Sequence, residues 1–524
     1  MPEKKEFDVI VIGGGPGGSM VSTLLADGGK SVLTLEAARF PRYHIGESLL
    51  LGTVDLLDKI GIREQLEAGG FIKKYGVEWV WGEHREPWTV DFRNAVSVNH
   101  HHTYQVERAP FDKMLLDNAR EHGVDVREQH KVTDFSIDAN GRCTVHYRRT
   151  DTGETGTATA RWLVDASGQG GTVTKRLHTQ EWDPYLKNMA VWSYWKGVTR
   201  HEGENAGNIF LPTFDDGWWW CIPLRDDVTS IGAVVDRESF SSLKSKDVKQ
   251  YYLDSFARTP ELAARMKNAE QVDEMHVQRD WSYIYDRFSG DGYLAIGDAA
   301  CFIDPLFSTG VHLAMLSGFI AATVVNTVLD KPELDRARML QFYEDTYRKE
   351  FSRLRDQVYF LYAGNKGSKE SYFWHARNHF GVPSIEPEKA FVSLIAGAFA
   401  HRAWYNHYAQ HLDVPDDLKK SVRSMSDEDG AHLDVPLIAS AGGSVVDDFA
   451  IDGRHLREAR SLVHTSGASI ACTPTVMAAV EHADGKRTGR EIIALITDRG
   501  IDSEERARST VHEVISHGFV EPKV

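Results

Sequence analysis

The chain has 524 residues, enough for roughly two to four domains, and its 42% hydrophobic and 26% charged residues are typical of an ordinary globular protein. Its formal net charge of −16 disfavours nucleic acid and anionic membranes as partners, because the field of the whole molecule repels both. The 4 cysteines form no CxxC pair, which argues against a disulfide scaffold or a zinc site and favours the reducing cytoplasm.

A βαβ unit opens the chain. Residues 8–12 are apolar after the first position, which predicts a parallel strand covered on both faces. A glycine-rich run at residues 13–18 follows, then a predicted helix over residues 19–28 and a second strand over residues 31–35 that ends at Glu36. The charged start of the chain runs straight into the first strand, so we expect no secretory signal.

The glycine-rich run fits the dinucleotide fingerprint GxGxxG at Gly13, Gly15 and Gly18. Glycines at these positions allow a tight turn and a close approach of the backbone to pyrophosphate, whose charge the helix N-terminus stabilises. Glu36 is placed to accept a hydrogen bond from a ribose hydroxyl. The unit therefore predicts an adenine dinucleotide and leaves FAD and NAD both open.

A second sheet is predicted in the middle of the chain, and its most unusual strand contains three adjacent tryptophans. Alternation along a strand places Trp218 and Trp220 on one face and Trp219 on the other. Taken alone, this stretch is typical of a bulky core strand, because aromatic residues favour strands. The other strand-like runs of this sheet are residues 75–81, 190–197 and 229–235.

Two conspicuous stretches are predicted to be structural. The histidine run at residues 100–102 is not expected to bind metal, because adjacent histidines on a strand point to opposite faces and no carboxylate or cysteine stands at ligand spacing. The apolar stretch at residues 311–329 includes His312 and Asn326, which predicts a buried helix and argues against a membrane span.

Two later strands end in turns that favour FAD over NAD. Residues 162–168 contain a strand end at Asp165, and residues 293–300 contain one that ends in Gly-Asp at Asp298. With the helix opening at residues 307–311, this arrangement resembles the way that flavin monooxygenases hold the ribityl chain and the pyrimidine edge of FAD. Only one full dinucleotide fingerprint is present, so we expect transiently bound NADPH or another protein to reduce the flavin.

The C-terminal third is predicted to be separate. From about residue 345 the pattern becomes helical and amphipathic, and the polar stretch at residues 424–430 predicts a boundary. Residues 484–493 and 518–520 resemble the small winged-helix modules related to PqqD. The predicted limits are 1–345 for an FAD-binding core, 346–430 for a helical region and 431–524 for the module, with an FAD subdomain at about 1–78, 105–180 and 285–345 and a substrate-sheet subdomain at about 79–104 and 181–284.

Together these motifs resemble the flavin-dependent halogenases, in particular the branch that acts on phenols and pyrroles, over roughly residues 7–377. The most specific feature is WxWxIP, from Trp218 to Pro223, combined with an upstream lysine. The resemblance implies an α/β fold with a Rossmann-like core similar to that of p-hydroxybenzoate hydroxylase. The other matching motifs are GGGPGG at residues 13–18, Phe-Pro-Arg at 40–42, Gly-Glu-Ser at 46–48, Tyr-Gln-Val-Glu-Arg at 104–108, Asp-Ala-Ser-Gly at 165–168, Gly-Asp-Ala-Ala at 297–300 and Ser-Tyr-Phe-Trp at 371–374.

The resemblance also implies the chemistry. Reduced FAD and O2 would give a C4a-hydroperoxide, which halide attacks to yield hypohalous acid. Trp218 and Trp220 would keep an organic substrate away from the flavin, and a lysine amine would catch the hypohalous acid. The family pattern Phe-x-x-Lys-x-Gly fits Phe71, Lys74 and Gly76, which selects the second lysine of the Lys-Lys doublet.

In this family, backbone amides at the helix opening bind halide, here those of Thr309 and Gly310. Tryptophan halogenases have a glutamate before Ser-Thr-Gly, whereas this chain has Phe307, which favours a phenol or pyrrole. No general base is obvious, and Lys74, water or a phenolate substrate remain open for that role. The other cofactor-binding residues that the resemblance implies are Arg42, Gln105, Arg108, Asp165 and Asp298.

We therefore expect a cytoplasmic FADH2-dependent halogenase of secondary metabolism that uses chloride or bromide and a separate flavin reductase. Its expected substrate is an electron-rich aromatic ring, as a hypothesis a phenol delivered on a carrier protein. The first alternative is a flavin-dependent aromatic monooxygenase or reductase of the same fold, in which the tryptophans are only core. The second is an inactive flavoprotein whose C-terminal module binds a carrier or peptide.

Overall fold

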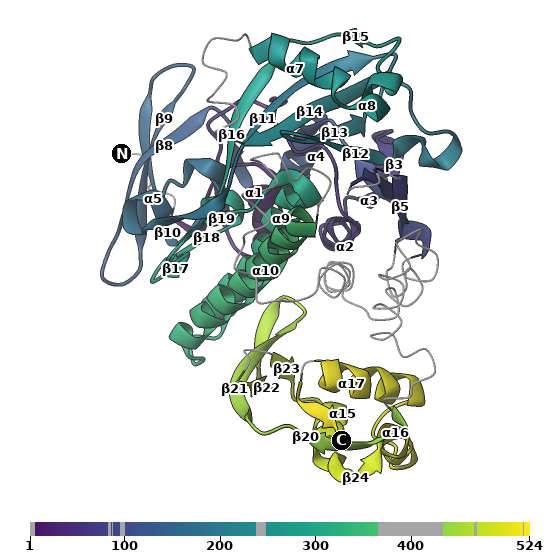
Figure 1. Ribbon diagram of the computed structural model, residues 1–524. Coiled ribbons are helices and arrows are strands. Elements are labelled where there is room, and N and C mark those ends of the chain that lie inside the picture. Colours follow the sequence, from purple (N-terminus) through teal and green to yellow (C-terminus); the bar gives the residue numbers. More distant parts are fainter. Residues whose placement is uncertain are drawn as a thin grey trace. The chain divides into compact units, whose positions relative to one another are not determined.

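The computed structural model describes residues 6–81, 85, 87–94, 100–236, 248–364, 433–465, 469–516 and 518–523 (Figure 1). The chain divides into two compact units. Unit 1 consists of Met1–Leu329 and Tyr343–Val422, and unit 2 consists of Asp330–Phe342 and Arg423–Val524.

Unit 1 contains an eight-stranded sheet whose central strands are parallel. Ile12 at the end of β1 lies opposite both Asp165 of β10 and Leu35 of β2, so the carboxyl ends of these strands meet at one edge. The strand order is β17-β18-β10-β1-β2-β7, and β8 and β9 extend β10. The strands are β1 (Glu6–Ile12), β2 (Val32–Leu35), β7 (Asp125–Arg127), β8 (His130–Ile137), β9 (Cys143–Arg149), β10 (Thr155–Asp165), β17 (Ser289–Gly290) and β18 (Tyr293–Ala295).

Two helices cross closely beside this sheet. A Cβ atom on Gly17 of α1 would lie 2.8 Å from the carbonyl oxygen of Ala314 in α9, and a Cβ on Gly318 would lie 2.9 Å from that of Gly17. Glycine is therefore required for the two backbones to approach. The helices around the sheet are α1 (Pro16–Asp27), α2 (Leu51–Lys59), α3 (Arg63–Ala68), α4 (Arg108–Glu121), α5 (Thr174–Leu177), α9 (Thr309–Asp330) and α10 (Arg336–Gly364).

The apolar helix α9 belongs to the core. Among the described residues it is the one helix long and apolar enough to cross a membrane, and 72% of that window is buried inside the protein. This agrees with the predicted buried helix at residues 311–329.

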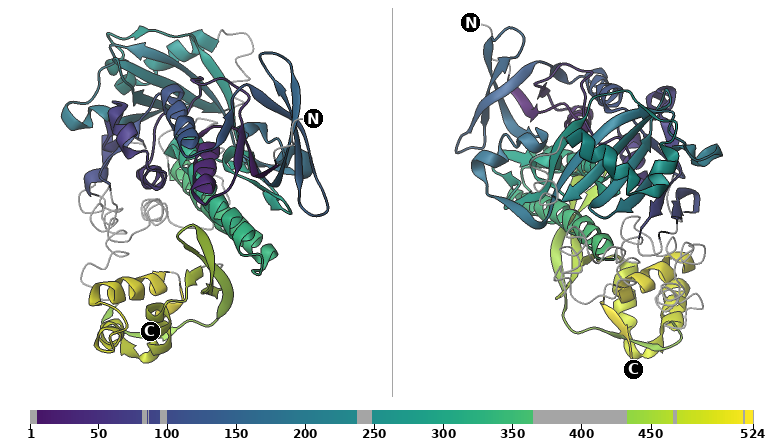
Figure 2. Two further views of the ribbon diagram at one scale, coloured as in Figure 1. Left: turned by 180° about the vertical axis from the view of Figure 1, so that it is seen from behind. Right: turned by 45° about the horizontal axis from the view of Figure 1, so that its top comes forward.

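The second sheet of unit 1 has nine strands in the order β19-β16-β11-β14-β13-β12-β4-β5, with β15 beside β11. Helices α7 (Val248–Ala257) and α8 (Pro260–Arg265) cover one face, as both views of Figure 2 show. The strands are β4 (Gly76–Val80), β5 (Pro87–Asp91), β11 (Gln180–Lys196), β12 (Ile209–Phe214), β13 (Gly217–Pro223), β14 (Val228–Asp236), β15 (Glu270–Gln271), β16 (His276–Tyr285) and β19 (Cys301–Phe302).

The tryptophan strand β13 alternates as predicted. Trp219 packs against Tyr252 and Phe256 of α7, whereas Trp218 and Trp220 line a cavity on the opposite face. The strand neighbour of Trp220 is Gly232 of β14, and a Cβ there would lie 2.1 Å from the indole ring. The indole therefore lies directly over the glycine.

Short elements connect the two sheets. Strands β3 (Ile72–Lys74) and β6 (Thr103–Gln105) pair with each other, and Ser48 forms a bridge to Gln105. The 3-10 turns are η1 (Phe92–Asn94), η2 (Gly168–Gly170), η3 (Gly203–Gly207), η4 (Gly297–Ala299) and η5 (Pro305–Phe307).

Unit 2 has its own hydrophobic core, which includes Leu437, Ile492 and Val511. Its helix α16 begins with a capping box between Thr488 and Glu491, the residues whose spacing indicates a helix start in the sequence. The elements are β20 (Pro436–Ala439), β21 (Gly443–Asp452), β22 (His455–His464), β23 (Ser469–Ala471), α15 (Pro474–His482), β24 (Asp484–Thr488), α16 (Gly489–Asp498), α17 (Glu504–Ser516) and β25 (Val520–Pro522).

The predicted α/β class is confirmed: a parallel Rossmann-like sheet is joined to a larger, mostly antiparallel sheet. Helix α10 runs from Arg336 to Gly364 and therefore spans the predicted limit at residue 346. The motif at residues 371–374 and the predicted boundary at 424–430 lie outside the described residues. The predicted subdomain limits and the winged-helix assignment stay predictions.

Candidate active site

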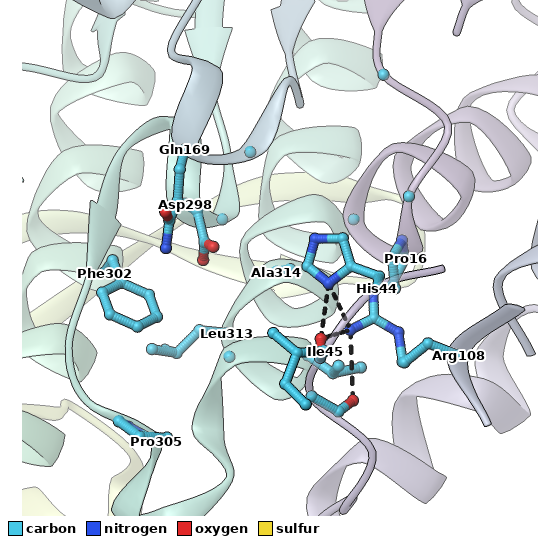
Figure 3. A pocket seen from close by; sticks show the side chains of 18 of the residues that line it. Pro16, His44, Ile45, Arg108, Gln169, Asp298, Phe302, Pro305, Leu313 and Ala314 are labelled. Atoms are coloured by element: carbon cyan, nitrogen blue, oxygen red, sulfur yellow. Dashed lines mark hydrogen bonds between the residues drawn. The ribbon is translucent and has the colours of Figure 1, made fainter. Parts of the chain in front are cut away.

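A cavity of about 520 Å³ is lined by residues of both sheets of unit 1. Its walls come from the glycine-rich turn, the end of β2, residues 42–48, the turn after β10, one face of the nine-stranded sheet and the start of α9. Figure 3 shows Asp298 and Phe302 on one side of this cavity, with His44 and Arg108 on the other. A cavity whose walls include both the glycine-rich turn and the tryptophans fits a dinucleotide.

The glycine-rich turn fits a phosphate group. Gly13 has φ 103°, and a Cβ there would lie 2.4 Å from the carbonyl oxygen of Ala166, so only glycine allows this turn. Gly15 lines the cavity, and a Cβ on it would meet nothing closer than Arg42 at 3.4 Å. Gly18 lies behind the wall, where a Cβ would lie 2.0 Å from the carbonyl oxygen of Gly13. Two glycines thus shape the fold, and Gly15 leaves the backbone open to a ligand.

Glu36 lies at the end of β2, in the cavity wall where the sequence predicts the ribose. Its carboxylate accepts hydrogen bonds from the backbone N–H groups of Gly14 and Ala38, each at 2.7 Å. These two amides fix the orientation of the carboxylate toward the cavity.

Arg42 and Arg108 both line the cavity and share the buried carboxylate of Asp112. Arg108 donates to it from Nε at 2.7 Å and Nη2 at 2.9 Å, and Arg42 Nη1 lies 2.9 Å from it. Arg108 also donates to the carbonyl oxygen of Ile45 at 2.7 Å (Figure 3). Two guanidinium groups with one shared carboxylate leave net positive charge for an anionic ligand.

Asp298 lines the cavity on η4, and burial raises the pKa of its carboxyl to about 7. Asp165 and Gln105, also predicted to bind FAD, are not among the lining residues. Asp165 is fully buried and accepts from the backbone N–H groups of Ser167 at 3.1 Å and Val173 at 2.5 Å. It therefore shapes the turn after β10, and Ser167 lines the cavity in its place.

The amide of Gln105 donates to the carbonyl oxygen of Gly207 at 3.0 Å. Because its backbone pairs with β3 and with Ser48, the side chain is fully buried between sheet elements. Its amide nitrogen is thus held by the backbone, and the predicted contact of Gln105 with FAD stays a prediction.

The predicted halide-binding residues Thr309 and Gly310 line the cavity at the first turn of α9. The preceding Ser308 has a left-handed φ of 56°, which turns the chain sharply into the helix. A Cβ on Gly310 would meet nothing within 4 Å, so the space at its side-chain position is open. An exposed helix N-terminus of this kind attracts a small anion.

The tryptophan wall consists of Trp218 and Trp220, whose ring centroids lie 6.4 Å apart. Trp218 Nε1 donates to the hydroxyl of Tyr362 at 2.7 Å, and Trp220 Nε1 donates to that of Ser230 at 3.1 Å. Both indoles are therefore buried, oriented groups with satisfied N–H donors.

Lys74 is 1% exposed, whereas its neighbour Lys73 lies at the surface. Its Nζ donates to Ser48 Oγ at 2.8 Å and to the carbonyl oxygen of Leu49 at 3.1 Å. Both contacts are neutral oxygen atoms, and burial lowers the pKa of the amine to about 7. Ser48 lines the cavity, so Lys74 lies directly behind that wall.

Glu47 is a cavity residue that sequence reasoning missed, although its Gly-Glu-Ser motif is part of the family pattern. It is 3% exposed, and its Oε1 accepts from the hydroxyl of Tyr194 at 2.7 Å. Burial raises the pKa of its carboxyl to about 7, and the hydroxyl groups of Ser230 and Tyr194 oppose that rise.

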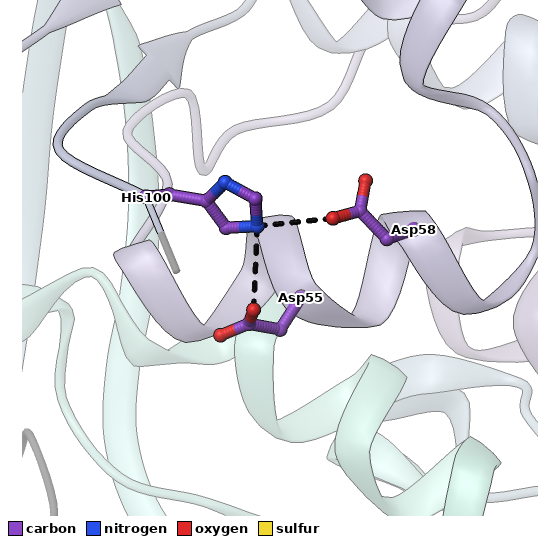
Figure 4. Close-up of side chains that lie close together, drawn as sticks. All are labelled: Asp55, Asp58 and His100. Atoms are coloured by element: carbon purple, nitrogen blue, oxygen red, sulfur yellow. Dashed lines mark ion pairs between the residues drawn. The ribbon is translucent and has the colours of Figure 1, made fainter. Parts of the chain in front are cut away.

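A second cluster of titratable side chains lies outside the cavity (Figure 4). His100 Nε2 lies 3.3 Å from Asp55 and 3.0 Å from Asp58. The sequence shows no carboxylate at ligand spacing from His100, and the fold brings these two to it from α2. Arg63 pairs with Asp58 at 2.7 Å and lies 3.0 Å from the imidazole, so a cation already occupies this cluster.

Comparisons with known proteins agree with this geometry. A family model described as tryptophan halogenase matches residues 8–102 and 93–411. A tryptophan 2-halogenase from Chondromyces crocatus is 36% identical over 399 residues, which cover 74% of this chain and 75% of that protein. The solved structure of CmlS, a flavin-dependent halogenase, has a TM-score of 0.85 at 28% identity and covers 98% of this chain and 96% of its own. The myxobacterial chondrochloren halogenase CndH, an FAD-dependent halogenase, has a TM-score of 0.68 at 38% identity over 75% of this chain and 91% of its own.

Proposed function

The chain belongs to the tryptophan halogenase family and is a flavin-dependent halogenase that uses FAD, and from this premise we propose that Lys74 relays halogen to an electron-rich aromatic ring. The observation that carries the proposal is the buried amine of Lys74, bound to the cavity residue Ser48 and with its pKa lowered to about 7. An amine in this state is ready to act either as an ammonium donor or as a nucleophile.

FAD fits the residues of the cavity. Gly15 and the start of α1 would take the pyrophosphate, Glu36 the ribose, and Asp298 the ribityl chain. Arg42 and Arg108 add the positive charge that a dinucleotide needs. Bound FAD, once a separate reductase has reduced it, supplies with O2 the two-electron oxidation of halide to hypohalous acid.

The chain's own residues separate halide from substrate. The N–H groups of Thr309 and Gly310 would hold the halide at the start of α9. The indoles of Trp218 and Trp220 fill the adjacent wall, so an aromatic substrate cannot reach the flavin end of the cavity. Halogen must then leave the cavity as a small species, and we place its transfer at Ser48, which lines the cavity and binds Lys74 Nζ.

Lys74 has two available routes. As a neutral amine, Nζ takes the halogen of hypohalous acid while the O–X bond breaks, and the hydroxide takes the amine proton and leaves as water. The ring then attacks the halogen, and C–X forms as N–X breaks; Nζ keeps the electron pair and takes up a proton, which restores the amine. As an ammonium, Nζ instead donates a hydrogen bond to the oxygen of hypohalous acid. The ring attacks the halogen, the O–X bond breaks, and the hydroxide takes the ammonium proton and leaves as water. A pKa of about 7 populates both forms.

The ring proton requires an acceptor, and Glu47 is the group that the structure adds to the candidates. Its carboxylate accepts from Tyr194 and interacts with the hydroxyl of Ser230, and burial raises its pKa to about 7, which suits proton exchange near neutral pH. It precedes Ser48, the residue that binds Lys74 Nζ. We assign Oε2 as the atom that takes the proton from the halogenated ring.

Two substrate classes are supported by specific observations. Phe307, which lies before Ser-Thr-Gly with its ring centroid 6.1 Å from that of Trp79, favours a phenol or pyrrole, which needs no glutamate to stabilise developing charge. The likeness to a tryptophan 2-halogenase makes indole the second candidate. Delivery of a phenol on a carrier protein is the finer hypothesis, and unit 2 is the candidate docking module.

The test is a single turnover of FADH2-loaded protein with O2, bromide or chloride, and a panel of phenols, pyrroles and tryptophan. We expect a halogenated product by mass spectrometry, and we expect Lys74→Ala to abolish it while FAD binding and flavin oxidation persist. Lys73→Ala is the matched control and should retain activity, because Lys73 is exposed. A hydroxylated product that does not depend on halide would instead support the monooxygenase alternative, and halogenation by Lys74→Ala would show that another residue relays the halogen.

A further inference from the structure

Asp304 receives hydrogen bonds from three separate elements around the cavity. Its carboxylate is 3% exposed and lines the cavity. Oδ1 accepts from the backbone N–H of Leu306 at 3.0 Å, which caps η5 directly before the halide-binding turn. Oδ2 accepts from Asn188 Nδ2 of β11 at 2.9 Å, and both oxygens lie 3.2 Å from the hydroxyl of Tyr362 in α10.

Tyr362 connects this carboxylate to the tryptophan wall. Its hydroxyl accepts from Trp218 Nε1 at 2.7 Å and is fully buried, so its own proton must be donated to a neighbouring acceptor. Asp304 is the acceptor, which fixes the direction of the chain of hydrogen bonds from Trp218 through Tyr362 to Asp304. The end of α10 is held in turn by Trp81, whose Nε1 donates to the carbonyl oxygen of Leu361 at 3.3 Å.

We propose that Asp304 and Tyr362 are positioning residues that fix the halide-binding turn and Trp218 at a set separation. This inference rests on the proposed function, since it concerns the same site. The turn at Thr309 and the indole of Trp218 belong to different elements of the fold. The carboxylate of Asp304 is connected to the first through the N–H of Leu306 and to the second through the hydroxyl of Tyr362. Catalysis depends on such separations because a small misplacement of reacting groups lowers the fraction of productive encounters. Loss of the hydrogen bonds from Trp218 through Tyr362 to Asp304 would lower the yield of halogenated product, and more of the consumed O2 would be released as hydrogen peroxide.

The chain contains a second buried hydrogen bond from a tryptophan to a tyrosine, which serves as a control for the one between Trp218 and Tyr362. On the opposite face of the same sheet, Trp195 Nε1 donates to the hydroxyl of Tyr252 at 3.1 Å. Tyr252 is also fully buried, and its hydroxyl donates to the carbonyl oxygen of Ile231 at 2.7 Å. Tyr252 lies outside the cavity lining. Tyr362→Phe and Tyr252→Phe therefore remove the same group from comparable buried settings. Neither tyrosine lines the cavity, but only Tyr362 is hydrogen-bonded to the lining residues Trp218 and Asp304.

The experiment compares both variants with the wild-type protein, each loaded with FAD. The first measurement is the amount of halogenated product and of hydrogen peroxide per FADH2 oxidised. The second is a bromide titration of the oxidised protein, followed by the flavin absorbance. We expect Tyr362→Phe to lower the product yield about tenfold, to raise peroxide release accordingly and to weaken bromide binding severalfold, while FAD affinity stays within twofold. Tyr252→Phe should keep wild-type yield and bromide affinity.

Equal product yield and equal bromide affinity in the two variants would overturn the positioning role. If Tyr362→Phe fails to fold, Asp304→Asn is the second variant: its amide oxygen can still cap η5, but the second acceptor oxygen is gone, so the same loss of yield is expected. Wild-type yield in Asp304→Asn would overturn the proposal. Absence of halogenated product from the wild-type protein with every acceptor would count against the proposed function and not against this link, which the bromide titration still tests.

Discussion

At the scale of single residues, Lys74 combines function with a stability cost. The pKa of its amine falls from 10.5 in the unfolded chain to about 7 in the folded protein. The unfolded state therefore binds more protons than the folded state between pH 7 and 10.5, so the free energy of unfolding rises with pH in that window. Below pH 7 the amine is charged in both states, and the cost of burying that charge lowers the free energy of unfolding by its full amount. Burial of the amine that we propose as the relay therefore lowers the stability of the fold.

We predict that Lys74→Met raises the free energy of unfolding by about 1 kcal/mol at pH 6 while abolishing halogenation, because an apolar chain fills the buried site without a charge to desolvate. The gain should shrink toward pH 10. Denaturation by urea at pH 6 and pH 9.5 measures both values. A variant that is less stable than the wild type at pH 6 would show that the bonds to Ser48 and Leu49 outweigh the desolvation of the amine.

Glu47 gives the opposite pH dependence. Its pKa rises from 4.5 to about 7, so its contribution to stability is fully present below pH 4.5 and is lost as the pH rises through 7. We predict that Glu47→Gln removes this slope, so the variant gains stability relative to the wild type between pH 5 and pH 8. The same variant should lower the halogenation rate at least tenfold and remove the limb of the pH–rate profile near pH 7. An unchanged profile would exclude Glu47 as the proton acceptor.

At the scale of elements, strand β13 depends on one small neighbour in β14. A Cβ at Gly232 would lie 2.1 Å from the ring of Trp220, so the indole must move if residue 232 has a side chain. We predict that Gly232→Val destabilises the protein by about 1 to 3 kcal/mol and lowers the halogenated product per FADH2. Gly443→Ala, in a strand where a Cβ finds no atom closer than 3.6 Å, is the control and should change neither. Equal behaviour of the two variants would show that the wall tolerates displacement.

The sequence predicts those elements whose pattern is local. The apolar run at residues 8–12, the glycines that follow and the acid at Glu36 form one continuous βαβ signature, and alternation alone separates Trp219 from its two neighbours. The Phe-x-x-Lys-x-Gly spacing likewise distinguishes Lys74 from Lys73. In each case the physical rule acts within a few residues along the chain.

The site residues that the sequence does not predict depend on contacts that only the fold creates. Asp112, which holds both cavity arginines, lies in α4 with no motif to mark it. Tyr362 reaches Trp218 across 144 positions of sequence. Gln105 and Asp165 belong to family motifs, but their side chains turn away from the cavity into backbone hydrogen bonds. A motif therefore marks the neighbourhood of a site and does not tell which of its side chains face the ligand.

At the scale of the whole molecule, the two units have separate cores, and the cavity belongs entirely to unit 1. We predict two thermal transitions in calorimetry. FAD should raise the midpoint temperature of the unit 1 transition alone, because a ligand stabilises only the part that binds it. A single transition that moves as a whole with FAD would show that the units unfold together.

Because side chains alternate along β13, adjacent tryptophans of this strand have different surroundings and therefore differ in how a bound flavin affects their fluorescence. Of the chain's 13 tryptophans, Trp218 and Trp220 of this strand and Trp192 of β11 line the cavity that would hold FAD, whereas Trp219 lies behind the sheet against Tyr252 and Phe256. Energy transfer to a bound flavin falls steeply with distance and depends on the angle between the rings. Emission from the three cavity indoles therefore reports occupancy of the site, and a Trp219→Phe variant would remove background emission from the neighbour of Trp218 and Trp220.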